Sequence, residues 1–147
     1  MDGDRAIAKI LKAEGVEWMT CFPSHSLIDA AAREGIRPIV CRQERAGVNI
    51  ADGASRTNNG KTVGVFCMQR GPGAENAFAG VATAYSDSSP LLVLPSGYPR
   101  ERAGWPRYFT AAHAYPGVTK WLEQVNTSSQ TVDAMRRSIS RLKNGRM

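Results

Sequence analysis

The sequence lacks any long apolar run and has few cysteines. No stretch of 18 apolar residues occurs in its 147 residues, so no membrane-spanning helix is expected. The N-terminal residues have neither a basic segment nor an apolar segment of the kind found in secretory signals. The three cysteines, Cys21, Cys41 and Cys67, are odd in number and widely spaced, which excludes a C-x-x-C pair and a disulfide framework. We therefore expect free thiols in a reducing cytoplasm, and no metal site.

The charge is unbalanced but not clustered. Nineteen lysines and arginines against thirteen acidic residues give a net charge of +6, which suits an anionic partner. The basic residues are scattered and do not alternate with aromatic residues, so a nucleic-acid partner is not expected. The length and the hydrophobic content of 42% are typical of one globular domain.

Apolar strands alternate with helical patterns along the chain. Strands are predicted over 16–22, 37–41, 62–68, 90–97 and 118–125. The helical patterns cover a first helix capped by Asp4 and ended by Gly15, a short helix closed by Gly35, and the ranges 43–57, 71–85 and 128–147. This order predicts an α/β fold, a three-layer doubly wound and mostly parallel sheet of about five or six strands with helices on both faces.

The helix predicted over 43–57 has a face of small residues. Ala46, Gly47, Ala51 and Ala54 are expected to face inward, where they would allow another helix to come close. Such a close-packing surface also favours self-association of the chain.

Unusual residues follow each predicted strand. They are Pro23-Ser24-His25, Gln43-Glu44, Gln69-Arg70-Gly71-Pro72-Gly73 and Ser96-Gly97. The carboxyl ends of parallel strands meet at one edge of a sheet, where ligands of such folds bind. The sequence therefore predicts a site at this edge, with Glu44 in it.

Taken singly, the motifs at this edge are ambiguous. Glu44 alone fits a carboxylate in the first turn of a helix, where the helix dipole favours it. The segment "RGPGAEN" alone suggests a glycine loop that holds a phosphate, but Pro72 lacks the N–H that such a loop would use. The lysine of a P-loop is also absent, so a tight turn is an equal alternative.

Taken together, the motifs resemble a known family. "FPS", "RQERAGVNIADGASR", "QRGPGAENAFAGVATAYSDSSPLLVLPSG" and "GVTKW" occur in this order. They resemble the N-terminal pyrimidine-binding domain of thiamine-diphosphate-dependent enzymes, in the acetolactate synthase-like branch. The resemblance covers nearly all of residues 1–147, and its most specific part is the glutamate followed by G-P-G-x-x-N and A-Y-x-D-S-x-P.

The resemblance implies roles for individual residues. Glu44 matches the family's catalytic glutamate, which hydrogen-bonds N1′ of the aminopyrimidine and so promotes loss of the thiazolium C2 proton. The cofactor-binding residues implied beside it are Gly71, Pro72, Gly73 and Asn76. Pro23 and Ser24 match the family's P-G turn, with serine in place of glycine.

Four further residues are candidates for the substrate pocket. His25 follows the P-G-like turn, where a neutral imidazole could relay protons in catalysis, although a partly exposed loop histidine is the simpler alternative. Gln69 and Arg70 stand where many relatives carry small residues, which leaves the shape of the substrate pocket open. His113 lies in an irregular segment, and Arg70 could equally form a surface pair.

The family's second half is not evident in this sequence. Relatives hold the diphosphate through Mg²⁺ with a G-D-G motif in a partner domain, and no such motif occurs here. Relatives also continue into a last strand, so the domain is expected to be cut short of it. We expect a chain that is inactive alone and that needs a diphosphate-binding domain or subunit, a homo-oligomeric interface and a 2-keto acid substrate; the full enzyme could also carry FAD.

Two alternatives remain open at this point. The first is the small subunit of a split decarboxylase for sulfopyruvate or phosphonopyruvate, for which a neighbouring reading frame with G-D-G would decide. The second is a non-catalytic, flavodoxin-like module that binds phosphate and would prefer nucleotides to thiamine compounds.

Overall fold

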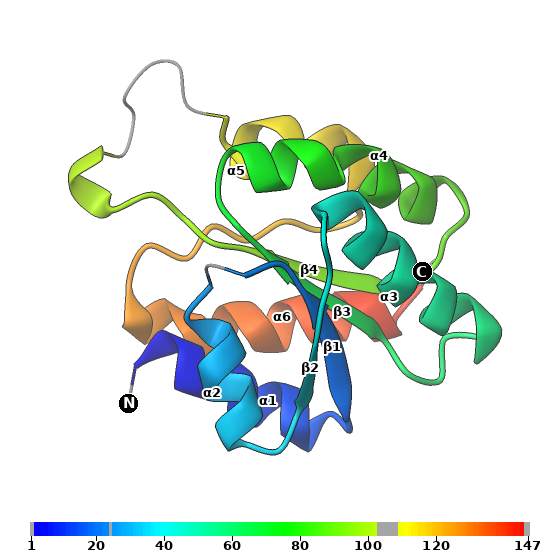
Figure 1. Cartoon of the computed structure of the whole chain (residues 1–147), viewed down its shortest axis with the longest axis horizontal. Coiled ribbons are helices and arrows are strands. Elements are labelled where there is room, and N and C mark those ends of the chain that lie inside the picture. Colours follow the sequence, from blue (N-terminus) through cyan, green and yellow to red (C-terminus); the bar gives the residue numbers. More distant parts are fainter. Residues whose placement is uncertain (1, 24, 103–108, 146–147) are drawn as a thin grey trace.

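The computed structural model describes residues 2–23, 25–102 and 109–145 (Figure 1). Its strands are β1 (Trp18–Cys21), β2 (Arg37–Val40), β3 (Gly64–Met68) and β4 (Leu91–Pro95). Its helices are α1 (Gly3–Ala13), α2 (Leu27–Arg33), α3 (Glu44–Thr57), α4 (Pro72–Ser86), α5 (Ala111–Ala114) and α6 (Thr131–Lys143), with 3-10 turns η1 (Arg100–Arg102), η2 (Pro116–Val118) and η3 (Ser128–Gln130).

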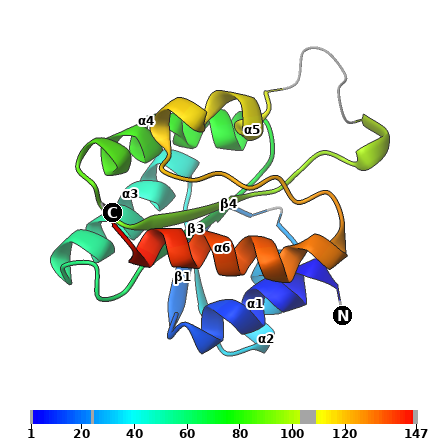
Figure 2. The ribbon, with the colours of Figure 1, turned by 180° about the vertical axis from the view of Figure 1, so that it is seen from behind.

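The strands form one parallel sheet between two layers of helices. The strand order is β2-β1-β3-β4, and every neighbouring pair is parallel. Helices α1, α2 and α6 cover one face, and α3, α4 and α5 cover the other (Figures 1 and 2). The predicted α/β fold with helices on both faces is therefore confirmed.

The central strand β3 is buried along its whole length, as its continuous apolar sequence predicted. Its side chains divide between two cores. Val65 and Cys67 pack with α1, α2 and α6, whereas Phe66 and Met68 pack with α3 and α4. The three cysteines are buried and free, in agreement with the expectation of free thiols, and burial raises the pKa of the Cys67 thiol.

Two details of the sequence prediction were wrong. The cap of α1 is Asp2, whose carboxylate accepts a hydrogen bond from the Arg5 N–H at 2.8 Å, and Asp4 lies in the first turn instead. Ala46 is exposed rather than inward, because the buried face of α3 is set by Gly47, Val48 and Ala51.

The predicted strand over 118–125 is not formed, and the described sheet has four strands rather than five or six. Side chains tie this segment to α6 instead. The Arg141 guanidinium lies 4.6 Å from the centre of the Trp121 ring, and Arg137 pairs with Glu123 at 2.6 Å. The backbone therefore runs beside α6, and a groove separates it from the edge strand β4.

Close contacts fix α3 across β1 and β3. The Thr20 hydroxyl donates to the Gly47 carbonyl at 2.8 Å, and a Cβ atom on Gly47 would lie 2.4 Å from the Phe66 ring. On the next helix, a Cβ atom on Gly80 would lie 2.3 Å from Val48. The predicted close approach of another helix to α3 is thus real, and it brings the starts of α3 and α4 together.

A second tie holds the far end of α3 to the amino ends of β3 and β4. The buried Ser55 hydroxyl donates to the Pro90 carbonyl and accepts from the Gly64 N–H, both at 2.6 Å. One side chain thus satisfies two backbone groups that water cannot reach.

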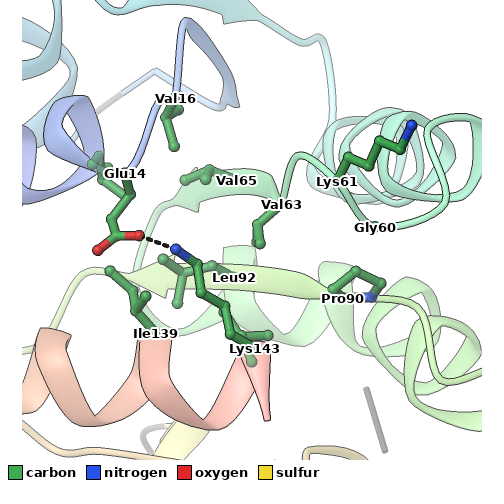
Figure 3. Close-up of a pocket in the computed structure, with 12 residues that line it drawn as sticks. Glu14, Val16, Gly60, Lys61, Val63, Val65, Pro90, Leu92, Ile139 and Lys143 are labelled. Atoms are coloured by element: carbon green, nitrogen blue, oxygen red, sulfur yellow. Dashed lines mark hydrogen bonds and ion pairs between the residues drawn. The ribbon is translucent and has the colours of Figure 1, made fainter.

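The structure has a cavity of about 300 Å³ near the amino ends of the strands (Figure 3). Val16, Val65 and Leu92 form part of its apolar wall, and Lys143 pairs with Glu14 across its opening. In the described part of the chain, no helix has the length and the apolar character needed to cross a membrane.

Replacing Ser55 by alanine tests the tie between α3 and the sheet. Ser55→Ala leaves the Pro90 carbonyl and the Gly64 N–H buried without a partner, so we expect the free energy of unfolding to fall by about 2–4 kcal/mol. Urea unfolding of the chain measures it. The control is Thr57→Ala, an exposed hydroxyl on the same helix, which should change stability by less than about 0.5 kcal/mol. Equal effects of the two variants would contradict this account of Ser55.

Candidate active site at the carboxyl edge of the sheet

The loops that follow the four strands begin side by side at one edge. The Phe22 N–H donates to the Cys67 carbonyl, and the Cys41 N–H donates to the Cys21 carbonyl, which ties the ends of β1, β2 and β3 together. The Ser96 N–H donates to the Met68 carbonyl, which joins the end of β4 to the same group. The predicted gathering of the strand ends is therefore present.

Glu44 begins α3 at this edge and is 6% exposed. Its oxygen Oε2 accepts a hydrogen bond of 2.7 Å from the side-chain amide of Asn76 on α4. This bond joins two motifs that are 32 residues apart in the sequence, and it fixes the rotation of the carboxylate. Glu44 is thus a buried carboxylate at the carboxyl edge of the sheet, and not a carboxylate on a remote solvent face.

The other oxygen of Glu44 lies against the first turn of α4. A Cβ atom on Gly73 would lie 2.9 Å from Glu44 Oε1, so glycine allows the carboxylate to pack this close to the helix start. Pro72 is the first residue of the helix, and Gly71 precedes it with φ of 59°, a conformation that favours glycine. The four residues predicted beside Glu44 therefore lie in one turn and its helix start.

Tyr115 holds this helix start from the other side. Its buried hydroxyl donates to the Ala74 carbonyl at 2.6 Å, and its ring packs against Phe78 at 5.8 Å. Burial raises the pKa of the Tyr115 phenol, so the hydroxyl keeps the proton that it donates. The first turn of α4 is thereby anchored independently of Glu44.

Gln69 and Arg70 continue β3 toward the same site. The Cβ position of Gly73 is 2.9 Å from the Cβ of Gln69, so Gln69 borders the turn that faces Glu44. Arg70 is exposed, and its guanidinium lies 5.5 Å from the centre of the Tyr98 ring. Both residues lie at the edge where the sequence predicted a substrate pocket.

His25 is half-buried just before the start of α2. Its Nδ1 accepts a hydrogen bond of 3.1 Å from the Leu27 N–H. Burial lowers the pKa of His25, and the Asp4 carboxylate and a hydrogen bond with the Leu94 backbone oppose this shift. A role of His25 in catalysis stays a prediction, and the structure gives it a second role as a helix-start acceptor.

The remaining predicted residues lie farther along the edge. Pro23 is exposed directly after β1, and Ser24 lies outside the described residues. His113 is exposed on α5 and lines the same open groove as Arg70.

Sequence reasoning missed Thr20, Tyr98 and Tyr115. Each acts through a contact with a backbone carbonyl or a glycine 27 or more residues away, and neither spacing nor composition signals such a contact. For Tyr98, the only sequence signal was its position just after the Ser96-Gly97 turn.

Comparisons with known proteins define the family. A family model described as "Thiamine pyrophosphate enzyme, N-terminal TPP binding domain" matches residues 1–129. This chain belongs to that family, which confirms the resemblance of its motifs and removes the phosphate-binding module as an alternative.

Relatives with curated names are acetolactate synthase large subunits. The chain is 37% identical over 107 residues to a probable acetolactate synthase large subunit of Methanocaldococcus jannaschii, and 40% identical over 107 residues to one of Methanococcus aeolicus. These matches cover 71% of this chain and 18% of each relative. It is 37% identical over 98 residues to the acetolactate synthase isozyme 3 large subunit of Escherichia coli, with 64% of this chain and 17% of the relative covered. The chain thus spans about a fifth of the length of these relatives.

The site fits the aminopyrimidine end of thiamine diphosphate. Glu44 is a nearly buried carboxyl group that packs against Gly73, and a carboxyl group can share a proton with a ring nitrogen. Within residues 2–23, 25–102 and 109–145, no group of three His, Cys, Asp or Glu side chains could hold a metal ion.

The pH dependence of stability tests the environment of His25. Burial lowers the pKa of His25 in the folded chain. The imidazole of His25 therefore takes up a proton at about pH 6.5 in the unfolded chain, and only at a lower pH in the folded chain. The free energy of unfolding should therefore have its highest value above pH 6.5. Below pH 6.5 it should decrease as the pH falls, with a slope of up to about 1.4 kcal/mol per pH unit. His25→Asn keeps an acceptor for the Leu27 N–H and should remove this part of the slope.

Urea unfolding at a series of pH values between 5 and 8 makes the measurement. The control is His113→Asn, which removes an exposed imidazole and should keep the slope of the parent chain. A parent chain whose stability rises as the pH falls from 7 to 5.5 would contradict a buried, neutral His25.

Proposed function

We propose that this chain is the pyrimidine-binding part of a thiamine-diphosphate-dependent carboligase or decarboxylase that acts on 2-keto acids. The observation that carries the proposal is the hydrogen bond from Asn76 to the buried Glu44 carboxylate, made directly beside Gly73. The names of the relatives support an acetolactate synthase-like reaction.

Glu44 Oε1 and N1′ of the aminopyrimidine would share a proton. Burial keeps water away from the carboxyl group, so water does not compete with the ring nitrogen for the shared proton. Asn76 keeps Oε2 occupied and thereby directs Oε1 toward the ring. When bound, thiamine diphosphate supplies the electron sink that 2-keto acid chemistry needs.

The rest of the enzyme would come from outside this chain. A diphosphate-binding domain or subunit with Mg²⁺ would hold the other end of the cofactor, so we propose that residues 1–147 are inactive alone. The buried free thiols support a cytoplasmic location.

We also propose that the domain is completed by a further strand on β4. In the described sheet β4 pairs only with β3, and a groove of about 1270 Å³ lies between β4, the 119–127 segment and α6. Leu92 and Leu142 line both this groove and the cavity of Figure 3. An extended segment placed here would cover apolar side chains and pair with the outer edge of β4.

A homo-oligomeric contact is proposed on the helices that carry the site. The outer surface of α3 exposes Ala46 and Ile50, and that of α4 exposes Ala79. Small and apolar residues of this kind allow helices of another subunit to pack closely. Such a contact would also shield Glu44 and Asn76 from solvent.

Glu44→Gln in the protein that carries both cofactor-binding parts tests the proton role. Glutamine keeps the size and one hydrogen bond but cannot pass a proton, so exchange of the thiazolium C2 proton should slow by about 10²–10⁴. Cofactor affinity should change much less. Hydrogen–deuterium exchange at C2, followed by NMR, is the measurement.

The control is Glu75→Gln, an exposed carboxylate in the first turn of α4. It should exchange at the rate of the parent enzyme. If Glu44→Gln also exchanges at that rate, Glu44 is only a helix-start carboxylate and the proposed proton role is wrong.

A further inference from the structure

The groove beside the site carries more cations than anions. The arginines on its wall are Arg70, Arg100, Arg102 and Arg141, against the acids Asp4 and Glu123. Glu123 is paired with Arg137, and Arg141 lies on the Trp121 ring. A cationic groove of this kind favours an anionic ligand.

Arg70 is the arginine of this group that is held next to the site. Its guanidinium lies over the Tyr98 ring, a cation–π arrangement at 5.5 Å. Tyr98 is itself seated on the turn, because a Cβ atom on Gly71 would lie 2.2 Å from its hydroxyl oxygen. In the described ranges of the chain, no carboxylate forms an ion pair with Arg70. Arg70 is thus held by its contact with Tyr98, and no carboxylate of the described residues neutralises its charge.

The turn connects this guanidinium to the catalytic carboxylate. Gln69 precedes Arg70, and the Cβ position of Gly73 is 2.9 Å both from Gln69 Cβ and from Glu44 Oε1. The chain from Gln69 to Gly73 therefore presents Arg70 on one side and borders Glu44 on the other. Arg70 lines the groove that opens beside this turn.

The reaction chemistry limits which anion Arg70 can usefully bind. The carboxylate beside the keto carbon loses its charge when it leaves as CO₂. A cation paired with that carboxylate would stabilise the substrate more than the transition state, and would slow the reaction. A fixed guanidinium instead suits an anionic group that keeps its charge throughout.

We propose that Arg70, seated on Tyr98, selects a 2-keto acid that carries a second, distal anionic group. This inference rests on the proposed function and names its substrate class. A distal carboxylate, sulfonate or phosphonate would each offer the oxygens that the guanidinium fork can pair. Tyr98 is a positioning residue, because it acts through Arg70.

The test compares substrates of equal shape in the protein that carries both cofactor-binding parts. The first pair is 2-oxoglutarate and 5-methyl-2-oxohexanoate, in which an isopropyl group replaces the distal carboxylate. Sulfopyruvate and phosphonopyruvate are compared with 4,4-dimethyl-2-oxopentanoate, in which a tert-butyl group replaces the sulfonate or phosphonate, to distinguish the other two anions. The parent enzyme should have a higher kcat/KM for at least one substrate with a distal anionic group than for its counterpart without that group.

Arg70→Ala should reduce this preference by about 10- to 100-fold, mainly through KM, because it removes a charge-assisted interaction. Arg70→Lys should keep part of the preference, since the charge remains without the planar fork. Tyr98→Leu should lower it in the same direction as Arg70→Ala. The matched control is Arg33→Ala, an exposed arginine at the end of α2, which should keep the full preference.

Binding of thiamine diphosphate to every variant, followed by fluorescence quenching, separates the possible failures. If cofactor binds but the parent enzyme shows no preference, or Arg70→Ala leaves the preference unchanged, the inference is wrong and the proposed function stands. If the parent enzyme binds no cofactor, the proposed function is wrong and this inference falls with it.

Discussion

The hydrogen bond between Asn76 and Glu44 is the interaction on which the rest of the site depends. The bond forms only if the first turns of α3 and α4 lie side by side, which requires the two helices to pack closely. Gly47 allows α3 to lie on Phe66, and Gly80 allows α4 to lie on Val48. A larger side chain at either glycine would move one helix start away from the other. Gly47 and Gly80 therefore serve the geometry of the Glu44 carboxylate by setting how closely the two helices pack.

Much of this arrangement could be predicted from the sequence, because it follows from local patterns. The apolar run that became β3, the glycine-rich turn at Gly71 and the small face of α3 each have a local physical cause. The prediction of a strand over 118–125 was wrong because Trp121 and Glu123 bind arginines on α6. The alternation of apolar and polar residues in a sequence does not reveal such contacts. Tyr98 was missed for a similar reason, since its contact is with a glycine 27 positions earlier.

The two ends of the strands have different surroundings. The carboxyl edge gathers Glu44, Asn76 and Arg70, whose polar groups suit a reacting anion and a ring nitrogen. The edge strand β4 and the amino edge instead present apolar side chains and a surface ion pair (Figure 3). This division supports the proposal that a ligand binds at the carboxyl ends of the strands.

The central claim is that Glu44 receives the aminopyrimidine through its N1′ atom. NMR of the chain with ¹³C-labelled carboxyl groups, titrated with the pyrimidine half of thiamine at millimolar concentration, tests this most directly. We expect the Glu44 carboxyl signal and the amides of Gly73 and Asn76 to shift together. A ring analogue with carbon in place of N3′ should give the same shifts, and one with carbon in place of N1′ should give none. Equal shifts with both analogues, or shifts that leave Glu44 unmoved, would contradict the account.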